Sequence, residues 1–528
     1  MLFNSSEFVL LFLPIALGGY YLVGRLNKPA ASVAWLVLAS SLFYSYWNVA
    51  FVPILAMSLL ANYALGRALG RQQSKWLLGA GIAANLLLLG WFKYANFLVD
   101  NIDWAFGAGI SLPAIALPLA ISFYTFQQIA YLVDTYDSGD AETSFLRYSC
   151  FVLFFPHLIA GPIVLYQDVR RQLTSPETFR FNRTHLVFGL TIFAIGLFKK
   201  TCLADSIGPI ADGLFRDAAA GTVPTFGEAW IGVLAYSVQL YFDFSGYSDM
   251  AIGLALMFNI RLPINFWSPY KSASIIEFWS RWHITLTRFL TTYVYNPILM
   301  HFTRKRMKQG KPLLRRSSFA LGPFISLLIV PTLLTMLLSG IWHGAGWQFV
   351  IWGLLHGLML VVNHGWRTFR HAYGIGPEVG RPFRPLGIAL TFIGVVLALV
   401  FFRAGSVEQA LIVFRGLAAA TGPLFPSTGG LFLNSDIALV FLGLAIIWLL
   451  PNALQWVGGF EAQGFGAKGS EAPSRTKEMG WSWITAWRPL RWKWSPSLGH
   501  GAFVGVLTCF ALIRVFGVVP SQFLYFTF

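Results

Sequence analysis

The stretch "LSGIWHGAGW", Leu338 to Trp347, places a histidine between two long apolar runs. Residues 319–338 before it and 347–364 after it are each long and apolar enough to predict a helix that crosses a membrane. His343 therefore lies at the end of a predicted spanning helix, where an ionisable group is costly and by default functional. The structural alternative is a packing histidine that bonds a backbone carbonyl at a helix end.

The composition of the whole chain agrees with a membrane protein. Of its 528 residues, 56% are hydrophobic and only 11% are charged, against about 25% charged in soluble proteins. The formal charge is +16, but the basic residues fall in short loops between apolar runs. That pattern sets membrane topology and does not indicate nucleic-acid binding.

Apolar runs predict an all-α polytopic membrane protein with roughly 11–14 transmembrane or re-entrant helices. Two stretches, 147–166 and 245–260, are interrupted by Pro, Gly or Asp and are expected to cross or to turn back. The continuous candidates are 8–24, 30–48, 50–66, 76–92, 114–134, 184–203, 227–243, 319–338, 347–364, 386–402, 436–451 and 500–518.

The positions of the Lys and Arg residues predict the orientation of the chain in the membrane. The densest basic cluster, Arg304 to Arg316, should be cytoplasmic. With single helices between them, loops 365–385 and 461–495 fall on the same side, so the alternation is self-consistent. The His343 stretch then lies at the non-cytoplasmic end of helix 319–338, or on a turn that dips into the membrane there. The sequence shows no internal repeat of the kind that many transporters carry.

A second polar stretch is "EFWSRWHITLTRFLTTYVYNPI", Glu277 to Ile298. Read as one helix, it places Trp279, His283 and Thr287 on one face and its arginines on another. An amphipathic, partly buried helix is predicted. The structural alternative is an interfacial helix with a solvated His283.

Two further histidines lie in apolar surroundings. His356, in "WGLLHGL", is expected to be a packing residue of a single apolar helix. His157, in "FFPHLIAGPI", lies beside two prolines and a glycine, which predicts a helix break. Broken helices at membrane depth tend to line cavities, so His157 is a candidate cavity residue.

Asp243 and Asp249, in "YFDFSGYSDMAIG", are expected to pair with Arg281 or Lys271, or to cap helix ends, with structural support the favoured role. No HExxH, paired-histidine or cysteine ligand set predicts a metal site. The sequence also lacks the GxSxG, Walker and GxGxxG motifs of serine hydrolases, NTPases and Rossmann enzymes.

Taken together, "EFWSRWHITLTRFL" and "GIWHGAGWQFVIWGLLHG" resemble the paired signatures of the membrane-bound O-acyltransferase family, and most closely its bacterial alginate O-acetyltransferase branch. The stretches "WFKYANF", "LPLAISFYTFQQIAYLVDTY", "FPHLIAGPI" and "QLYFDFSGYSDMAIGLALMFNI" add to the similarity. The resemblance implies a catalytic membrane core over 1–405, with helices around a central cavity or tunnel. Residues 406–528 would add C-terminal membrane helices and the basic cytoplasmic loop 461–495.

The resemblance also implies an activity and a location. Such enzymes of the bacterial inner membrane pass an acyl group, here acetyl, from a cytoplasmic-side donor to a hydroxyl. The donor would be acetyl-CoA or another acyl thioester, with no bound cofactor. The acceptor would be an exported, alginate-like polysaccharide or a periplasmic acetyl-transfer protein. His343 matches the family's catalytic histidine, and His283 matches the usual second one.

The remaining candidates receive supporting roles. His343 would act as general base or transient acyl carrier, while His283 and Arg281 orient the donor or bind its oxyanion. The tunnel wall would comprise Trp282, Trp342 and Trp347, with His157, Asp243 and Asp249 as further lining residues. Arg288 and the loop arginines would attract an anionic donor.

The sequence departs from the branch after "RWHI", where Thr291 and Thr292 replace an Arg-Asp pair and no Gly-Gly follows. This leaves the acceptor and any partner at the cytoplasmic surface open. Two other classes remain: a transporter or flippase for a polysaccharide or lipid precursor, and a non-enzymatic scaffold of an exopolysaccharide complex.

Overall fold

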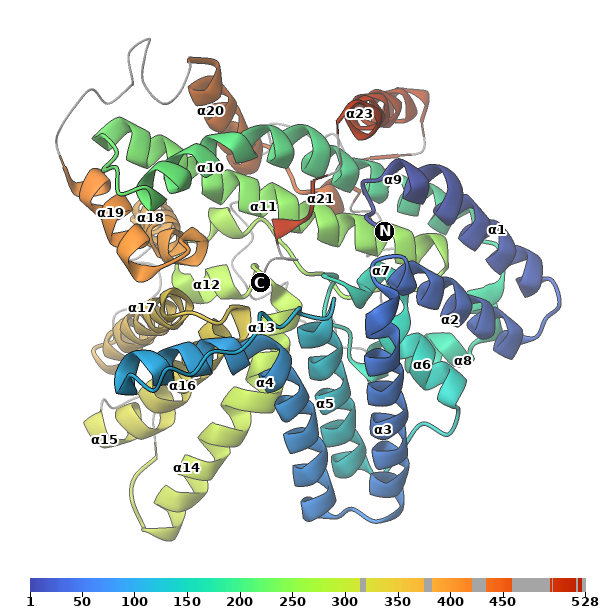
Figure 1. Ribbon diagram of the computed structural model, residues 1–528, viewed down its shortest axis with the longest axis horizontal. Helices are drawn as coiled ribbons and strands as arrows, with labels where there is room; N and C mark the ends of the chain where they lie inside the picture. The colour runs from blue at the N-terminus through green and yellow to red at the C-terminus, as the bar shows by residue number, and fades with distance from the viewer. Residues whose placement is uncertain are drawn as a thin grey trace.

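The structure, a computed structural model, describes residues 1–313, 320–374, 382–419, 434–457, 494–495, 497–518 and 521–524. Every regular element in these ranges is a helix (Figure 1). This confirms the expected all-α polytopic fold, while the number of crossings remains a prediction. The helical runs long and apolar enough to cross a membrane are Val49–Arg71, Lys75–Phe106, Arg183–Ala219, Leu321–His343, Trp347–Ala372, Arg384–Arg403 and Leu498–Gly517, and the shorter apolar ones are Phe8–Gly24, Pro29–Ser45 and Asn434–Leu449.

The helices follow one another as short and long segments. The first half of the chain contains η1 (Phe8–Phe12), α1 (Leu13–Gly24), α2 (Pro29–Ser45), η2 (Val49–Phe51), α3 (Val52–Arg71), α4 (Lys75–Phe106), α5 (Ile121–Ser138), α6 (Phe145–Leu153), α7 (Phe155–Leu158), α8 (Tyr166–Thr174), η3 (Pro176–Phe179), α9 (Arg183–Phe198), η4 (Lys199–Ala204), α10 (Asp205–Ala219) and α11 (Phe226–Met257). The second half contains η5 (Pro269–Lys271), α12 (Ile275–Trp279), α13 (Ile284–Leu290), η6 (Thr291–Tyr295), α14 (Asn296–Lys308), α15 (Leu321–Phe324), η7 (Ile325–Ile329), α16 (Val330–His343), α17 (Trp347–Ala372), α18 (Arg384–Arg403), α19 (Val407–Ala418), α20 (Asn434–Leu449), α21 (Ala453–Val457) and α23 (Leu498–Gly517).

The central element is α11, a helix of 32 residues that is buried along nearly its whole length. It begins with a capping box, in which Thr225 and Glu228 satisfy each other's backbone N–H groups. It packs against α9, α10, α18, α19 and α20 (Figure 1). The expected interruption at 245–260 is therefore wrong. The polar residues that suggested it are buried against partners on neighbouring helices, so the helix continues.

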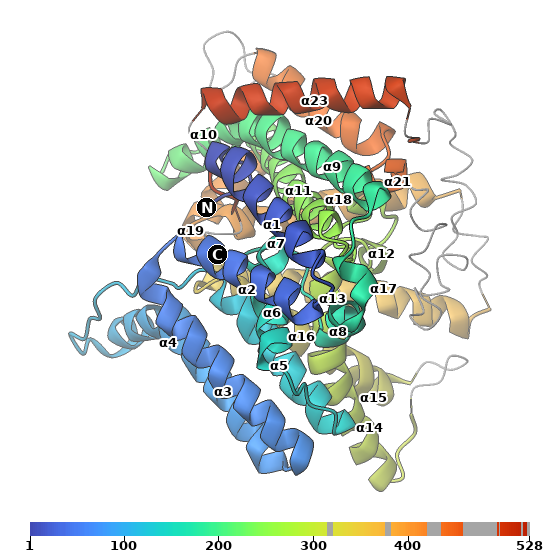
Figure 2. The same ribbon diagram turned by 90° about the vertical axis from the view of Figure 1, so that its right-hand side faces the viewer.

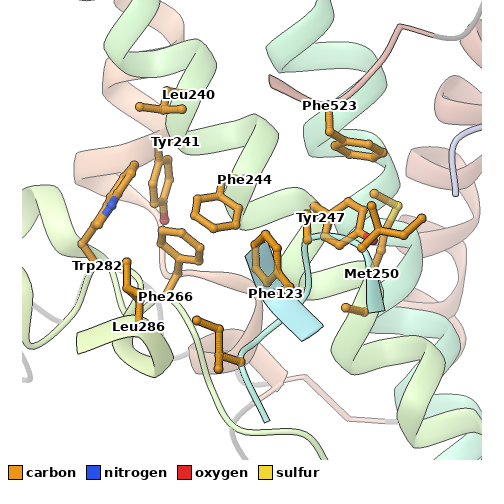
Figure 3. Packing of buried hydrophobic residues seen from close by; sticks show 14 of the residues in the cluster. Phe123, Leu240, Tyr241, Phe244, Tyr247, Met250, Phe266, Trp282, Leu286 and Phe523 are labelled. Atoms are coloured by element: carbon orange, nitrogen blue, oxygen red, sulfur yellow. The ribbon is translucent and has the colours of Figure 1, made fainter. Parts of the chain in front are cut away.

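The aromatic face of α11 builds the core. Figure 3 shows Tyr241, Phe244 and Tyr247 of α11 surrounded by side chains from distant segments. Phe244 lies 4.8 Å from Phe266 between ring centroids, and Tyr247 lies 4.6 Å from Phe523. The core therefore joins the middle of the chain to its C-terminal residues.

Prolines set the start of α5 and the break between α6 and α7. The predicted helix 114–134 begins only at Ile121, because Pro113 and Pro118 lack the backbone N–H that a helix needs. The predicted break within 147–166 is confirmed, since α6 and α7 are separated at Phe154, just before Pro156.

The basic helix ends lie together, as the topology prediction requires. Figure 2 shows α14 and α17 ending on the same side of the molecule. The last turn of α14 carries Lys305, Arg306 and Lys308, and that of α17 carries Arg370. Most of the predicted loop 461–495 lies outside the described residues.

Residues near the two ends of the chain meet. Asn4 donates from Nδ2 to the backbone oxygen of Ser521 at 3.2 Å. The backbone N–H of Leu524 donates to Asp243 Oδ2 at 3.0 Å. These contacts cross the predicted domain boundary at residue 405, which itself remains a prediction.

Helices α9 and α11 approach each other closely, and glycines face each other at their contact. A Cβ atom added to Gly189 would lie 2.6 Å from the backbone oxygen of Gly253, and one added to Gly196 would lie 2.6 Å from that of Gly246. Neither oxygen can move without shifting a helix. Small residues of this kind let membrane helices approach closely.

We expect Gly196→Ala to destabilise the protein by about 1–3 kcal/mol, because the added methyl group overpacks a backbone contact. The measurement is thermal unfolding and membrane accumulation of the purified variant. Gly90→Ala on α4 is the matched control, since a Cβ there meets nothing within 4 Å. Equal stability of the two variants would contradict the close α9–α11 contact.

Candidate active site

His343 is the last residue of α16 and is enclosed by aromatic rings. Its side chain is 3% exposed. The imidazole centroid lies 4.9 Å from the rings of Trp342 and Trp352, and 5.1 Å from Phe402. The predicted position at a helix end is confirmed. The surroundings are apolar, and they exclude bulk water from the ring.

A small cavity of about 10 Å³ opens beside this imidazole, which is space for about one water molecule. Its apolar lining consists of Leu240, Phe278, Val395, Leu399 and Phe402, and its remaining lining residues are Trp279, Trp282, His343, Trp352 and His356. Trp282 is therefore placed next to His343, as expected for a wall residue.

His356 was expected to be a packing residue, but it lines the same cavity as His343. Trp279 Nε1–H donates to His356 Nδ1 at 3.3 Å. In the neutral ring the proton then lies on Nε2, because Nδ1 accepts a hydrogen bond. No local sequence pattern indicates this position, because the packing of α16 against α17 brings the two histidines together.

His283 does not lie within a helix, so the interpretation of 277–298 as one continuous helix is wrong. The chain leaves α12 at Trp279 and re-enters a helix at Ile284, with His283 at φ 44°. Backbone hydrogen bonds from Trp267 N to Arg281 O and from Ile284 N to Asn265 O replace the helical ones. This left-handed conformation is uncommon for a residue other than glycine, and it tilts the imidazole out of the predicted face.

Asn265 holds His283 in place. Asn265 Oδ1 accepts hydrogen bonds from His283 Nδ1–H at 3.0 Å and from the Thr285 hydroxyl at 2.8 Å, and its Nδ2 donates to Ser248 Oγ at 3.1 Å. The side chains of Asn265 and His283 are both fully buried. With the proton on Nδ1, the basic nitrogen of His283 is Nε2. Asn265 was missed by the sequence analysis because nothing in its local pattern marks it.

The stretches that carry the two predicted histidines come together, because Trp282, the residue before His283, lines the cavity beside His343. The ring of Phe244 from α11 meets His283 edge-on at 4.8 Å between centroids. Two stretches far apart in the sequence thus meet against the central helix.

Arg281 and Trp347, which were predicted to line the tunnel, do not line the cavity beside His343. Arg281 forms an ion pair with Glu277 at 2.6 Å, and Glu277 also bonds Arg384 at 3.3 Å. Arg281 lines neither cavity described here. Trp347 is 56% exposed and donates to Asn101 Oδ1 at 2.8 Å. It does not border the cavity beside His343.

The two aspartates of α11 form buried ion pairs. Asp243 pairs with Lys200 at 2.7 Å, and Asp249 pairs with Lys199 at 2.6 Å. The expected partners Arg281 and Lys271 are wrong, because the facing helix run α9–η4 presents a lysine to each aspartate. These pairs join α11 to its neighbour, in line with the favoured structural role.

His157 lies in the predicted helix break and is 1% exposed. Its Nδ1 lies 3.2 Å from Gln127 Nε2 of α5. Within the described residues, the Nε2 atom of His157 has no hydrogen-bond partner. A role for His157 as a lining residue remains a prediction. In the same part of the chain, no three His, Cys, Asp or Glu side chains form a group that could hold a metal ion.

A much larger polar cavity, of about 1140 Å³, lies between the C-terminal end of α5, α8 and the start of α9. Its charged lining residues are Asp134, Asp140, Asp168, Arg170, Arg171, Glu177 and Arg261, and His185 also contributes. Partial burial lowers the pKa of Arg261 from its usual value, although a guanidinium remains protonated. The two cavities have no lining residue in common.

Hydrogen bonds connect the polar cavity with His283. Asp168 in its wall pairs with Arg288 at 2.6 Å, and Arg288 donates to the backbone oxygen of Ile163 at 3.3 Å. The N–H of Ile163 donates to Thr285 Oγ1 at 2.9 Å. Because Thr285 in turn donates to Asn265, the wall of the cavity is mechanically linked to the histidine.

Comparison with known proteins places these features in a family. The model of the family described as "MBOAT, membrane-bound O-acyltransferase family" matches residues 140–310 and 317–393. The peptidoglycan O-acetyltransferase of Helicobacter pylori is 40% identical over 457 residues, which is 80% of either chain. A protein named "Probable alginate O-acetylase" in Pseudomonas putida is 40% identical over 433 residues, 79% of this chain and 80% of that one.

The teichoic acid D-alanyltransferase of Bacillus subtilis is similar at a lower level, 27% identical over 275 residues, 52% of this chain and 65% of its own. The segments matched by the family model contain both His283 and His343. The chain therefore belongs to the membrane-bound O-acyltransferase family, and it is a multi-pass membrane acyltransferase.

Proposed function

We propose that this protein transfers an acetyl group from a cytoplasmic thioester to a hydroxyl group of an exported cell-envelope polysaccharide, across the bacterial inner membrane. The observation that carries the proposal is that His343 and Trp282, the neighbour of His283, line one cavity walled by aromatic rings, with both histidines buried. We infer the acetyl group and the polysaccharide acceptor from two relatives that are about 40% identical to this chain and are named for the acetylation of peptidoglycan and alginate. A periplasmic carrier that passes the group onward is an equivalent hydroxyl acceptor.

The donor would enter from the side of the basic helix ends. The 1140 Å³ cavity carries Arg170, Arg171 and Arg261 beside four acidic side chains, and its wall is linked to His283 through Arg288. Acetyl-CoA or another acyl thioester would place its polar part in this cavity. The acyl end would then have to reach His343 past Phe244 and Trp282, so these side chains would move when the donor binds.

The chemistry needs one base and a dry site. The acceptor oxygen attacks the thioester carbonyl while its proton passes to His343. The tetrahedral intermediate collapses, the carbon–sulfur bond breaks, and the thiolate takes up that proton as the ester forms. His283 orients the donor, and the indoles around the small cavity exclude water that would hydrolyse the thioester. Arg281, bound to Glu277, supports the local fold and does not contact the donor.

We expect His343→Ala to lower the ester content of the polymer by about 10²–10⁴-fold, because the general base is lost. The measurement is the amount of O-acetyl ester per unit of exported polymer, with the protein quantified in the membrane. His371→Ala, at the exposed end of α17, is the control and should retain full activity. A fall in exported polymer at unchanged ester content would indicate a transporter and contradict the proposal.

We expect Asn265→Ala to lower the rate of transfer by about 10–100-fold, because the partner that fixes the His283 ring is removed. Ser248→Ala removes only one neutral hydrogen bond of the same network and should change the rate by less than about fivefold. Both are measured as initial rates of ester formation. Similar losses in the two variants would show that Asn265 only stabilises the fold.

We expect Arg171→Gln to raise the KM for acetyl-CoA about two- to fivefold with kcat unchanged, since it removes an exposed positive charge from the donor cavity. The assay uses membrane vesicles and labelled acetyl-CoA. Arg180→Gln, an exposed charge outside the lining, is the control. An unchanged KM would remove this cavity from the donor route.

A further inference from the structure

A lysine from α4 reaches the end of α16 that carries His343. Lys93 Nζ donates to the backbone oxygen of Trp342 at 2.5 Å and to that of His343 at 3.3 Å. The neighbouring Tyr94 donates from its hydroxyl to the backbone oxygen of Ile341 at 2.8 Å. Three consecutive carbonyl groups of the last turn of α16 are therefore bonded by two adjacent residues of α4.

Burying the Lys93 ammonium group in α4 would cost free energy if the carbonyl groups of α16 did not bond it. Lys93 is the one basic residue of α4 after Lys75, and the apolar part of this helix is mostly exposed on the molecule's surface. A charged side chain at this position in a spanning helix loses hydration. The carbonyl end of α16 compensates, because a helix C-terminus has unbonded oxygens and carries partial negative charge.

The same ammonium group also lies 5.8 Å from the centroid of the Trp342 ring, within the range of a cation–π contact. Lys93 thus bonds the backbone of His343 and that of Trp342, whose ring packs against the imidazole at 4.9 Å. Trp352 and Phe402 also pack against the imidazole, at 4.9 and 5.1 Å. After His343 the chain runs through Gly344 to Gly346, which restrict the backbone little.

We propose that Lys93 is a positioning residue that fixes the backbone of Trp342 and His343, and thereby holds the His343 imidazole in the geometry needed for acyl transfer. This rests on the proposed function. Lys93 contacts no reacting atom and acts through the main chain. Catalytic groups must be held within about 0.5 Å of their productive position, and a misplacement of about 1 Å can cost about 10²-fold in rate.

The test compares adjacent substitutions in the full-length protein in cells. Lys93→Met keeps the length of the side chain and removes its donor, whereas Tyr94→Phe removes the donor one residue earlier on the same helix end. The readouts are the initial rate of labelled acetate incorporation into polymer ester, the amount of protein in the membrane, and the melting temperature of the purified variants.

The expected result is a fall of about 10²-fold in rate for Lys93→Met, less than about fivefold for Tyr94→Phe, and similar melting temperatures. Lys93→Arg, which can donate to both carbonyls, should restore at least about a third of the wild-type rate. If Lys93→Met fails to accumulate in the membrane, the rate of the Lys93→Arg variant still tests the inference. A folded Lys93→Arg variant with no activity would overturn the inference.

Two other results would also overturn it: a Lys93→Met rate within about twofold of wild type, or equal losses of rate and melting temperature in the Met and Phe variants. His343→Ala separates this test from that of the function. An active His343→Ala contradicts the proposed chemistry, whereas an inactive His343→Ala beside an active Lys93→Met contradicts only the role of Lys93.

Discussion

Polar groups inside a bilayer must find their partners within the protein, because lipid offers neither donors nor acceptors. This constraint organises the structure from α11 outward. The helix carries two aspartates into the core, and η4 supplies a lysine for each. Ser248, the residue before Asp249, accepts a hydrogen bond from the side-chain amide of Asn265, and Asn265 accepts one from His283. The polar groups of the site are thus anchored on the same helix that carries the two buried ion pairs.

The two histidines are held in different ways: a hydrogen bond fixes the ring of His283, whereas aromatic rings enclose that of His343. His283 is held by hydrogen bonds to a neutral amide, so its ring orientation and tautomer are set without a counter-charge. His343 is enclosed by ring contacts, and its backbone is bonded by Lys93. A cavity the size of one water molecule between such rings leaves little room for a competing nucleophile.

Much of this fold could be predicted from hydrophobic runs, because the length of an apolar segment reports directly on a membrane span. The helix break at Pro156 and the position of His343 at a helix end also followed from local sequence. The kink at His283 did not, because a positive φ in a residue other than glycine is imposed by tertiary contacts.

The partners of Asp243 and Asp249 were mispredicted for a related reason. Sequence shows which charges need a partner at membrane depth, but the choice between lysines and arginines depends on which helix faces α11. The paired glycines of α9 and α11, seven residues apart on either helix, carried that information in their spacing. Asn265 and His356 entered the site by the same route, through helix contacts that no local pattern reports.

The bond between Asn4 and Ser521 has a topological consequence. Asn4 precedes the first helix and Ser521 follows the last one that the structure describes. Phe3 and Phe523, which lie close to these residues in the chain, both pack against Tyr247 of α11. The segments before the first helix and after the last described one are therefore anchored on the same buried helix, and they close the described chain into a loop.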